Sequence, residues 1–266
     1  MTLTLGDGPL ASRSPDTVNY RIDGPGHRLF WQLFPRRIRA LLGDQVVLDS
    51  TRANLLHESN VLPQLYLPRT DIRVDLLEAS KHRTHCPFKG DAVYESVRVD
   101  ERVAENAVWS YPAPVDSAAW LAGHVAVYWE SMDFWFDEDE EVFGHIRDPY
   151  HRIDIRRTSR SVRIVVGDTE VAASRRALLL SETGMPNRFY LPPADVRTEF
   201  FALSATHTVC PYKGNASYQT LQVNGTVITD AVWLYPEPLP DARQIAGYFC
   251  FLADGIQTWV DGKPLD

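Results

Sequence analysis

The sequence predicts a mainly β protein built from two tandem copies of one small antiparallel domain. The run Cys86–Gly90 returns 124 residues later as Cys210–Gly214, and the two copies align without a gap. Apolar and polar residues alternate over Val93–Val99, which is typical of a half-buried strand. The dipeptide Asn224-Gly225 is a strong signal for the tight turn of a β-hairpin. A repeated unit with these signals favours mostly antiparallel sheets.

The repeat covers most of the chain and sets the expected domain boundaries. The same displacement links Pro25-x-His27-Arg28 with Pro149-x-His151-Arg152, Gly43-Asp44 with Gly167-Asp168, Tyr66-Leu67-Pro68 with Tyr190-Leu191-Pro192, and Trp109-x-Tyr111-Pro112 with Trp233-x-Tyr235-Pro236. We expect a flexible lead-in over residues 1–19, a first domain over 20–137, an acidic connector over 138–147 and a second domain over 148–266. A unit of this size can bury a core of its own.

Each unit is expected to contain a few further strands and one or two short helices. A short helix is predicted over Ser50–Leu56 and its copy Ser174–Leu180, with the serine as N-cap. A second is predicted over Asp116–Val125 and Asp241–Cys250, where apolar residues recur at helical spacing. Further strands are predicted at Arg73–Leu77, Arg197–Leu203, Val162–Val166, Phe134–Phe136 and Thr258–Val260.

Charge and composition exclude several classes of protein. The chain has 266 residues and a formal net charge of −8, which argues against a general nucleic-acid binder. The basic clusters that remain as candidates are Arg36, Arg37 and Arg39, and the loop Lys81–Arg83. No run is apolar enough to span a bilayer, and the N-terminus lacks the layout of an export signal. The chain has three cysteines, which do not form an even set of disulfide pairs, so we expect a reducing, cytoplasmic environment. We also expect no membrane partner.

The most distinctive local motif is Cys-Pro-aromatic-Lys-Gly. Proline restricts the preceding cysteine to an extended backbone, and the glycine permits a left-handed turn. The motif therefore predicts a rigid bend that presents a thiol and an ammonium together, Cys86 with Lys89 and Cys210 with Lys213. A nearby lysine can favour a thiolate. The alternative is a tight turn with a buried cysteine and an exposed lysine.

Other polar and aromatic side chains recur in both units. Glu58 and Glu182 are candidate bases or acceptors for the turn lysine, and the alternative is a surface carboxylate. Arg73 and Arg197 suit a bidentate grip on an anion, or else a structural ion pair with Asp71 and Asp195. Large aromatic side chains at strand positions are candidates for a pocket wall and equally for core: Tyr66, Tyr94, Trp109, Tyr190, Tyr218 and Trp233.

The sequence favours neither a metal nor a cofactor. The first unit offers His82, His85 and Cys86, but the second keeps only His207 and Cys210 at these positions. A zinc knot requires cysteines paired at short spacing. Nucleophile-elbow, Walker and dinucleotide motifs are all absent from the sequence. We therefore expect no metal ligands and no cofactor.

The combined pattern resembles the family described as domain of unknown function 427. In the first unit it reads Ser50…Glu58…Tyr66-x-Pro68-x-x-Asp71-x-Arg73…Cys86-Pro-Phe-Lys-Gly90…Trp109-x-Tyr111, and the second unit matches it in the same order. The resemblance implies a β-tent-like fold. The family is also labelled nucleotidyltransferase-like, but the chain has no Gly-Ser followed by a spaced Asp-x-Asp on adjacent strands, the arrangement that holds two Mg²⁺ ions. The acidic run Asp137–Glu141 lies in the expected connector and does not substitute for it.

Three hypotheses about function follow from these residues. The favoured one is a small-molecule or peptide binding module, with one pocket per unit near the Cys-Pro-aromatic-Lys-Gly loop. The first alternative is an enzyme that uses Cys86 or Cys210 as nucleophile, with Lys89 or Lys213 and Glu58 or Glu182 as acid and base. The second alternative is an assembly element, in which a pseudo-twofold contact between the units imitates a homodimer.

Overall fold

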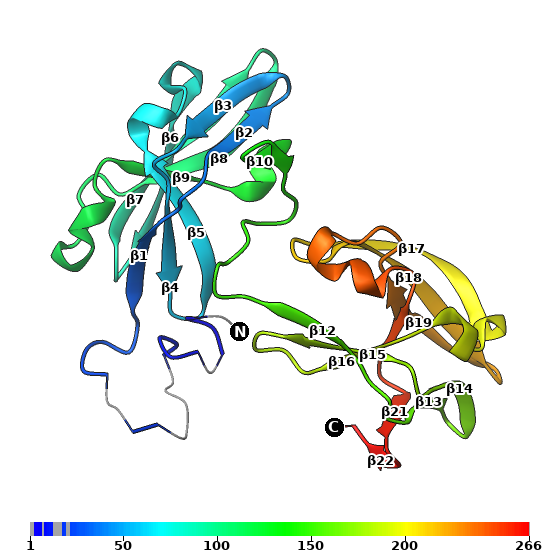
Figure 1. Ribbon diagram of the computed structural model, residues 1–266. Coiled ribbons are helices and arrows are strands. Elements are labelled where there is room, and N and C mark those ends of the chain that lie inside the picture. The colour runs from blue at the N-terminus through cyan, green and yellow to red at the C-terminus, as the bar shows by residue number, and fades with distance from the viewer. Residues whose placement is uncertain (1–2, 7, 13–17, 20–21, 266) are drawn as a thin grey trace. The chain divides into compact units, whose positions relative to one another are not determined.

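The computed structural model describes residues 3–6, 8–12, 18–19 and 22–265. The chain separates into two compact units, residues 1–148 and 149–266. The blue-to-green part of the ribbon in Figure 1 is the first unit, and the green-to-red part is the second. Each unit is mainly β and antiparallel, as the sequence predicted, and the two have the same strand order.

In the first unit, a seven-stranded sheet runs β1-β4-β5-β9-β8-β7-β6 and a four-stranded sheet runs β11-β10-β2-β3. The strands are β1 (Leu29–Leu33), β2 (Ile38–Leu42), β3 (Gln45–Ser50), β4 (Asn54–Glu58), β5 (Val61–Pro68), β6 (Leu77–Cys86), β7 (Gly90–Val99), β8 (Arg102–Ser110), β9 (His124–Val127), β10 (Phe134–Asp137) and β11 (Glu140–Glu141). The helical turns are 3₁₀: η1 (Arg69–Asp71), η2 (Val74–Leu76), η3 (Asp116–Leu121) and η4 (Trp129–Ser131).

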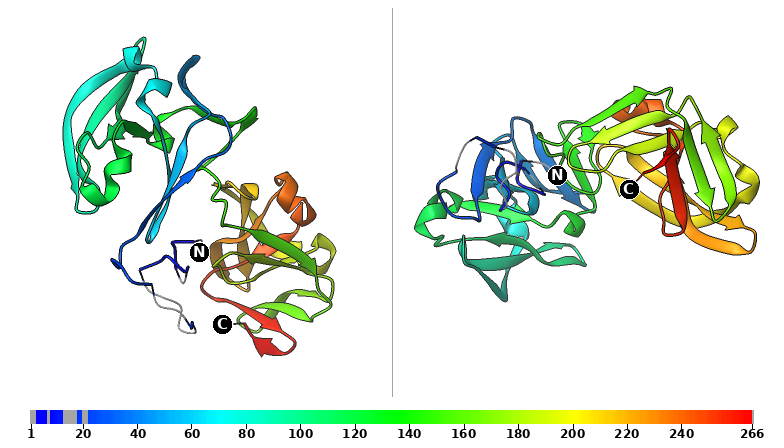
Figure 2. Two further views of the ribbon diagram at one scale, coloured as in Figure 1. Left: turned by 60° about the vertical axis from the view of Figure 1, so that its left-hand side comes forward. Right: turned by 90° about the horizontal axis from the view of Figure 1, so that it is seen from below.

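The second unit repeats this arrangement, with sheets β12-β15-β16-β20-β19-β18-β17 and β14-β13-β21-β22. Its strands are β12 (Ile153–Arg157), β13 (Val162–Val166), β14 (Thr169–Ser174), β15 (Leu178–Glu182), β16 (Arg188–Leu191), β17 (Phe201–Cys210), β18 (Gly214–Val223), β19 (Thr226–Leu234), β20 (Phe249–Phe251), β21 (Ile256–Val260) and β22 (Lys263–Pro264). Its 3₁₀ turns are η5 (Pro193–Asp195), η6 (Thr198–Phe200) and η7 (Pro240–Ile245). Figure 2 shows the strands from two further directions.

Each large sheet carries a buried apolar cluster on both of its faces. In the first unit, Leu55 and Val108 belong to the core shared with the small sheet. Leu56 and Trp109, the next residues on the same strands, belong to a second cluster that includes Leu121 of η3. Successive side chains of a strand point to opposite faces, so strands buried on both sides carry adjacent apolar residues.

This two-sided burial explains why the helix predicted over Ser50–Leu56 was wrong. Ser50 ends β3, and Asn54–Glu58 is strand β4. The adjacent residues Leu55 and Leu56 interrupt the alternation that signals a strand, because each packs on a different face. The copy behaves in the same way: Ser174 ends β14 and Leu178–Glu182 is β15.

The remaining element predictions were confirmed in part. The strands at Val93–Val99, Val162–Val166, Phe134–Phe136 and Thr258–Val260 are present. The helix predicted from Asp116 is a 3₁₀ turn that ends at Leu121, and β9 follows. The strand predicted over Arg73–Leu77 is wrong, because Val74–Leu76 is a 3₁₀ turn.

The hairpin turn predicted at Asn224-Gly225 was confirmed. Both residues have positive φ, 49° and 84°, in the turn between β18 and β19. This backbone is what Asn-Gly favours in a two-residue hairpin loop.

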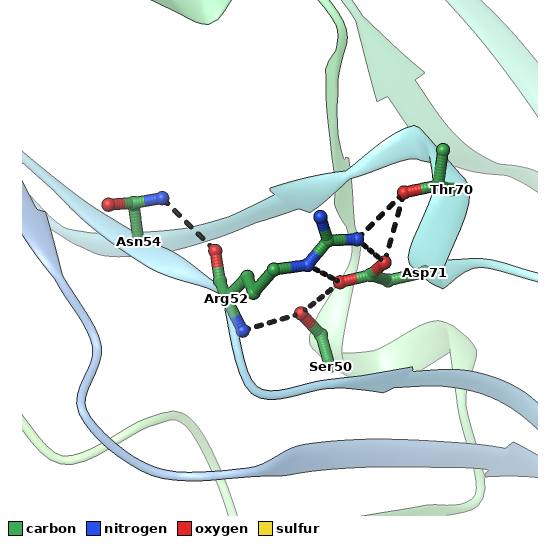
Figure 3. Close-up of polar contacts among 5 residues, drawn as sticks. All are labelled: Ser50, Arg52, Asn54, Thr70 and Asp71. Carbon is green, nitrogen blue, oxygen red and sulfur yellow. Dashed lines mark hydrogen bonds and ion pairs between the residues drawn. The ribbon is translucent and has the colours of Figure 1, made fainter.

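The serine predicted as an N-cap instead binds an aspartate. The Ser50 hydroxyl donates to Asp71 at 2.7 Å and accepts from the backbone N–H of Arg52 at 3.1 Å. The Arg52 guanidinium also contacts Asp71 and donates to Thr70 at 2.9 Å (Figure 3). These contacts attach η1 to the corner between β3 and β4. In the second unit, Ser174, Arg176 and Asp195 form the same set.

The environment of Asp71 keeps it ionised. Burial alone would raise the pKa of this carboxyl, but hydrogen bonds from Arg52, Ser50 and Thr70 outweigh burial and lower it. The pKa of Asp195 is also lowered, chiefly by the hydrogen bond from Arg176.

The acidic run that was predicted as a connector begins as part of the first unit. Asp137 pairs with Arg36 at 2.6 Å, and Asp139 pairs with Arg39 at 2.8 Å. Glu140–Glu141 forms β11 beside β10. The basic cluster Arg36, Arg37 and Arg39 is therefore matched by carboxylates, with Asp49 as the partner of Arg37.

The predicted lead-in over residues 1–19 lies partly outside the described residues. Its described part is bound to the first unit: the Leu10 carbonyl accepts a hydrogen bond from Ser59 at 2.7 Å, and the Ala11 carbonyl accepts one from Arg28 at 2.6 Å.

We predict that Asp71→Ala destabilises the first unit by about 1–3 kcal/mol, because Ser50, Arg52 and Thr70 lose a shared acceptor. Asp75→Ala is the matched control. Asp75 is exposed and Arg73 is the one side chain that it bonds among the described residues, so its loss should change the free energy of unfolding by less than about 0.5 kcal/mol. Amide hydrogen exchange on the full chain measures both effects, and equal effects of the two variants would contradict the assignment.

Candidate functional site

The Cys-Pro-aromatic-Lys-Gly motif forms the tight turn between β6 and β7, and between β17 and β18 in the second unit. The Lys89 N–H donates to the Cys86 carbonyl at 3.2 Å, and the Lys213 N–H donates to that of Cys210 at the same distance. Gly90 closes the first turn at a φ of 108°. A side chain there would be strained and would approach the Ala113 carbonyl to 3.2 Å. The predicted rigid bend is thus present, pressed against the loop that follows β8.

The turn lysine is buried and is paired with the predicted glutamate. Lys89 Nζ donates to Glu58 Oε2 at 2.5 Å, and Lys213 Nζ donates to Glu182 Oε2 at 2.6 Å. The lysine side chains are 12% and 10% exposed. Both glutamates end a strand, β4 or β15, so the pair joins the hairpin turn to the opposite part of the large sheet.

A histidine completes each site and was missed as a site residue in the sequence. His27 Nε2 lies 2.8 Å from Glu58 Oε1, and His151 Nε2 lies 3.0 Å from Glu182 Oε1. The signal was available, because Pro25-x-His27-Arg28 is one of the repeated segments. The sequence did not show that this histidine contacts the glutamate, because the two residues are 31 positions apart in the chain and meet only in the folded unit.

Backbone contacts hold the histidine segment next to the glutamate strand. The Arg28 N–H donates to the Ser59 hydroxyl at 2.9 Å, and the Ser59 N–H donates to the Arg28 carbonyl at 3.0 Å. Arg152 and Thr183 form the same reciprocal pair, at 2.8 and 2.9 Å. Each histidine is therefore positioned by the residues that adjoin it and its glutamate.

The aromatic residue of the turn packs on the histidine ring. His27 and Phe88 are stacked with ring centroids 3.8 Å apart, and His151 and Tyr212 lie 4.2 Å apart. We refer to His27, Glu58 and Lys89, and to His151, Glu182 and Lys213, as the two triads.

The charge state of the second triad follows from its contacts. Burial would raise the pKa of Glu182, but hydrogen bonds from His151 and Lys213 outweigh burial and lower it to about 2. The carboxylate is therefore ionised at neutral pH and can only accept hydrogen bonds. His151 must then donate from Nε2, which leaves Nδ1 of the neutral ring as an acceptor. The contacts of Glu58 with His27 and Lys89 are the same, so His27 also donates from Nε2.

Both units match the sequence profile of one family. The sequence profile of the family described as domain of unknown function (DUF427) matches residues 31–138 and again 154–262. The chain belongs to the DUF427 family. It carries two DUF427 units in tandem, as its repeat predicted. A search among curated proteins found no significant match.

In each DUF427 unit, predicted aromatic residues lie in one apolar cluster beside the turn. Tyr66, Tyr94 and Trp109 are buried in it together, and Cys86 packs against it. The Trp109 indole donates to the Tyr66 hydroxyl at 3.2 Å. In the second unit, Tyr190, Tyr218, Trp233 and Cys210 lie in the corresponding cluster, where Trp233 donates to Tyr190 at 3.1 Å.

Burial governs the ionisation of this cluster. It raises the pKa of Tyr66 and of Tyr190, so both phenols are neutral at physiological pH. Lys89 Nζ lies 5.9 Å from the centre of the Tyr111 ring, which connects the cluster to the triad.

The predicted arginines are not brought to the triads. Arg73 is exposed and pairs with Asp75, two residues away. Arg197 is likewise exposed and pairs with Glu199. Each arginine lies between two 3₁₀ turns, Arg73 between η1 and η2 and Arg197 between η5 and η6. Each forms its ion pair with an acidic residue of the second turn.

Within the described ranges, no three His, Cys, Asp or Glu side chains converge as metal ligands. His85 bonds Asp91 at 2.6 Å, and His82 packs on Tyr94. The described residues also include no helix long and apolar enough to cross a bilayer.

The lowered pKa of Glu182 predicts how this part of the second unit responds to acid. Its folded pKa lies below the ordinary value of about 4.3, so its contribution to stability is complete above about pH 5 and is lost as the pH falls towards 2. A ¹³C titration of the side-chain carboxyl should give a midpoint near pH 2. The Lys213→Met variant should shift that midpoint upwards, since it removes one of the two donors. A midpoint at or above 4 in the unaltered chain would show that the triad does not form.

Proposed function

We propose that each DUF427 unit is a binding module for a small molecule or peptide, and that its recognition site is the triad beside the Cys-Pro-aromatic-Lys-Gly turn. The observation that carries the proposal is the duplication of the triad in full. In both units the same three side chains come from the segment before the first strand, the end of β4 or β15, and the hairpin turn.

Stability alone is a weak reason for such a triad. Removing charged groups from water costs free energy that their mutual attraction often only balances, so well-packed apolar residues would serve as well. Perturbed titratable groups that are tied to a specific partner are instead typical of functional sites. Glu182, whose pKa is lowered to about 2, is a group of this kind.

The hydrogen-bonding capacity left over by the triad indicates the ligand. The lysine ammonium has three N–H donors, of which the glutamate accepts one. The histidine offers an acceptor at Nδ1. A ligand group that has both a donor and an acceptor could use the free lysine N–H and the histidine Nδ1, and the amide of a peptide or primary carboxamide is the simplest such group. The turn residues Phe88 and Tyr212 supply an adjoining aromatic surface.

A second candidate function is the enzyme hypothesis from the sequence, with Cys86 or Cys210 as nucleophile. The observation that favours acid–base chemistry is the glutamate–histidine contact, because a carboxylate that orients an imidazole leaves a basic nitrogen. The ammonium, however, is bonded to glutamate, which weakens the case for lysine activation of the thiol. An activated nucleophile would react with iodoacetamide at pH 6 faster than free cysteine, and equal or slower labelling excludes it. The assembly hypothesis stays a prediction.

We predict that N-acetylphenylalaninamide binds at both triads of the full chain. In an NMR titration it should shift the amide signals of Lys89 and Lys213 and of their turns. The double variant Glu58→Gln/Glu182→Gln should lose the effect by at least about tenfold in affinity, because it releases the lysine and the histidine from their shared acceptor.

The control for this titration is Arg73→Gln/Arg197→Gln, which alters the predicted arginines outside the triads and should bind like the unaltered chain. Single Glu58→Gln and Glu182→Gln variants should each lose only the shifts of their own unit. Absence of shifts in the unaltered chain, or equal binding by the double glutamate variant, would contradict the proposal.

A further inference from the structure

A hollow of about 360 Å³ opens on the first unit beside the aromatic cluster, and none of the triad residues lines it. Tyr94 of β7 and Tyr111, which follows β8, form part of its wall, together with apolar side chains such as Val93. This volume lies in the range of small-molecule sites. The polar residues that line it are Arg69, Arg83, Glu95, Ser110 and His124.

One cation in this hollow has no acidic partner in the described part of the chain. Arg69 is bound through both terminal nitrogens to Glu95, at 2.5 and 2.7 Å, so this pair is neutral as a whole. Arg83 instead donates to two backbone carbonyls, those of Ser80 at 2.7 Å and His82 at 2.6 Å. Those contacts orient its guanidinium but leave its charge uncompensated. The lining therefore offers about one net positive charge.

The second unit provides an internal comparison for these residues. The aromatic wall is kept, because Tyr218 and Tyr235 stand where Tyr94 and Tyr111 do. Every polar lining residue is changed: Arg69 to Pro193, Arg83 to His207, Glu95 to Gln219, Ser110 to Leu234 and His124 to Tyr248. The fold is the same in both units, so it does not require the polar residues that line the hollow of the first unit.

We infer that this hollow is a second binding site, present in the first unit alone, and that its ligand is a small aromatic carboxylate. The flat apolar part would lie against the tyrosine wall, and the carboxylate would accept hydrogen bonds from Arg83, whose planar guanidinium suits that geometry. A single negative charge matches the single uncompensated cation. A phosphate dianion would carry excess charge next to Glu95. The inference does not depend on the proposed function, since the residues, the ligand and the number of sites all differ.

The test is an NMR titration of the full chain with benzoate, with benzyl alcohol as the neutral analogue. Benzoate should shift the amide signals of Val93, Ser110 and His124, and leave those of Ser217 and Leu234 unchanged. Benzyl alcohol should bind at least about tenfold more weakly, because it makes no charge-assisted hydrogen bond. Raising the salt concentration should weaken benzoate binding and leave benzyl alcohol unaffected.

Two variants sharpen this test. Arg83→His installs the residue of the second unit and should weaken benzoate binding by at least about tenfold. Arg98→Gln is the control, because Arg98 is also on the first unit and exposed but pairs with Glu78 outside the hollow. The inference is overturned if benzoate causes no shifts, if both units respond equally, if benzyl alcohol binds as well as benzoate, or if Arg83→His and Arg98→Gln have the same effect.

Discussion

Each unit depends on one carboxylate that accepts hydrogen bonds from two distant segments. Glu58 and Glu182 lie at the end of a strand and bond the lysine of a hairpin turn and the histidine that precedes the first strand. The cost of burying the charge is offset only while both donors are in place. The turn, the histidine segment and the large sheet are therefore coupled through one side chain. The packing of the turn aromatic against the histidine ring joins the same two segments again.

The duplication separates features that both units share from features that only one unit has. Features that occur twice include the triads, the network around Asp71 and Asp195, and the aromatic cluster. The polar lining of the hollow occurs once, on a wall of tyrosines that occurs twice. The two units therefore differ at the polar lining of the hollow and agree at the triads.

Much of the fold could be predicted from the sequence. The repeat, the alternation over Val93–Val99 and the Asn224-Gly225 turn depend on local signals, and all were confirmed. The prediction failed at Ser50–Leu56, because a strand buried on both faces loses its alternation and a serine beside it resembles a helix cap. The candidate site could be predicted in part, because the repetition of its residue types in both units identified Lys89 and Glu58. Which residues meet is set by long-range pairing, so His27 was missed and Arg73 was included.

The orientation of the two triad histidines tests this account most directly. If the glutamates are shared acceptors, each imidazole must carry its proton on Nε2 when the ring is neutral. A long-range ¹H–¹⁵N correlation spectrum of the full chain, recorded at pH 8, distinguishes the two ring nitrogens. We expect the Nε2–H form for both His27 and His151, and loss of that preference in Glu58→Gln/Glu182→Gln. The Nδ1–H form, or a mixture that the double variant leaves unchanged, would contradict it.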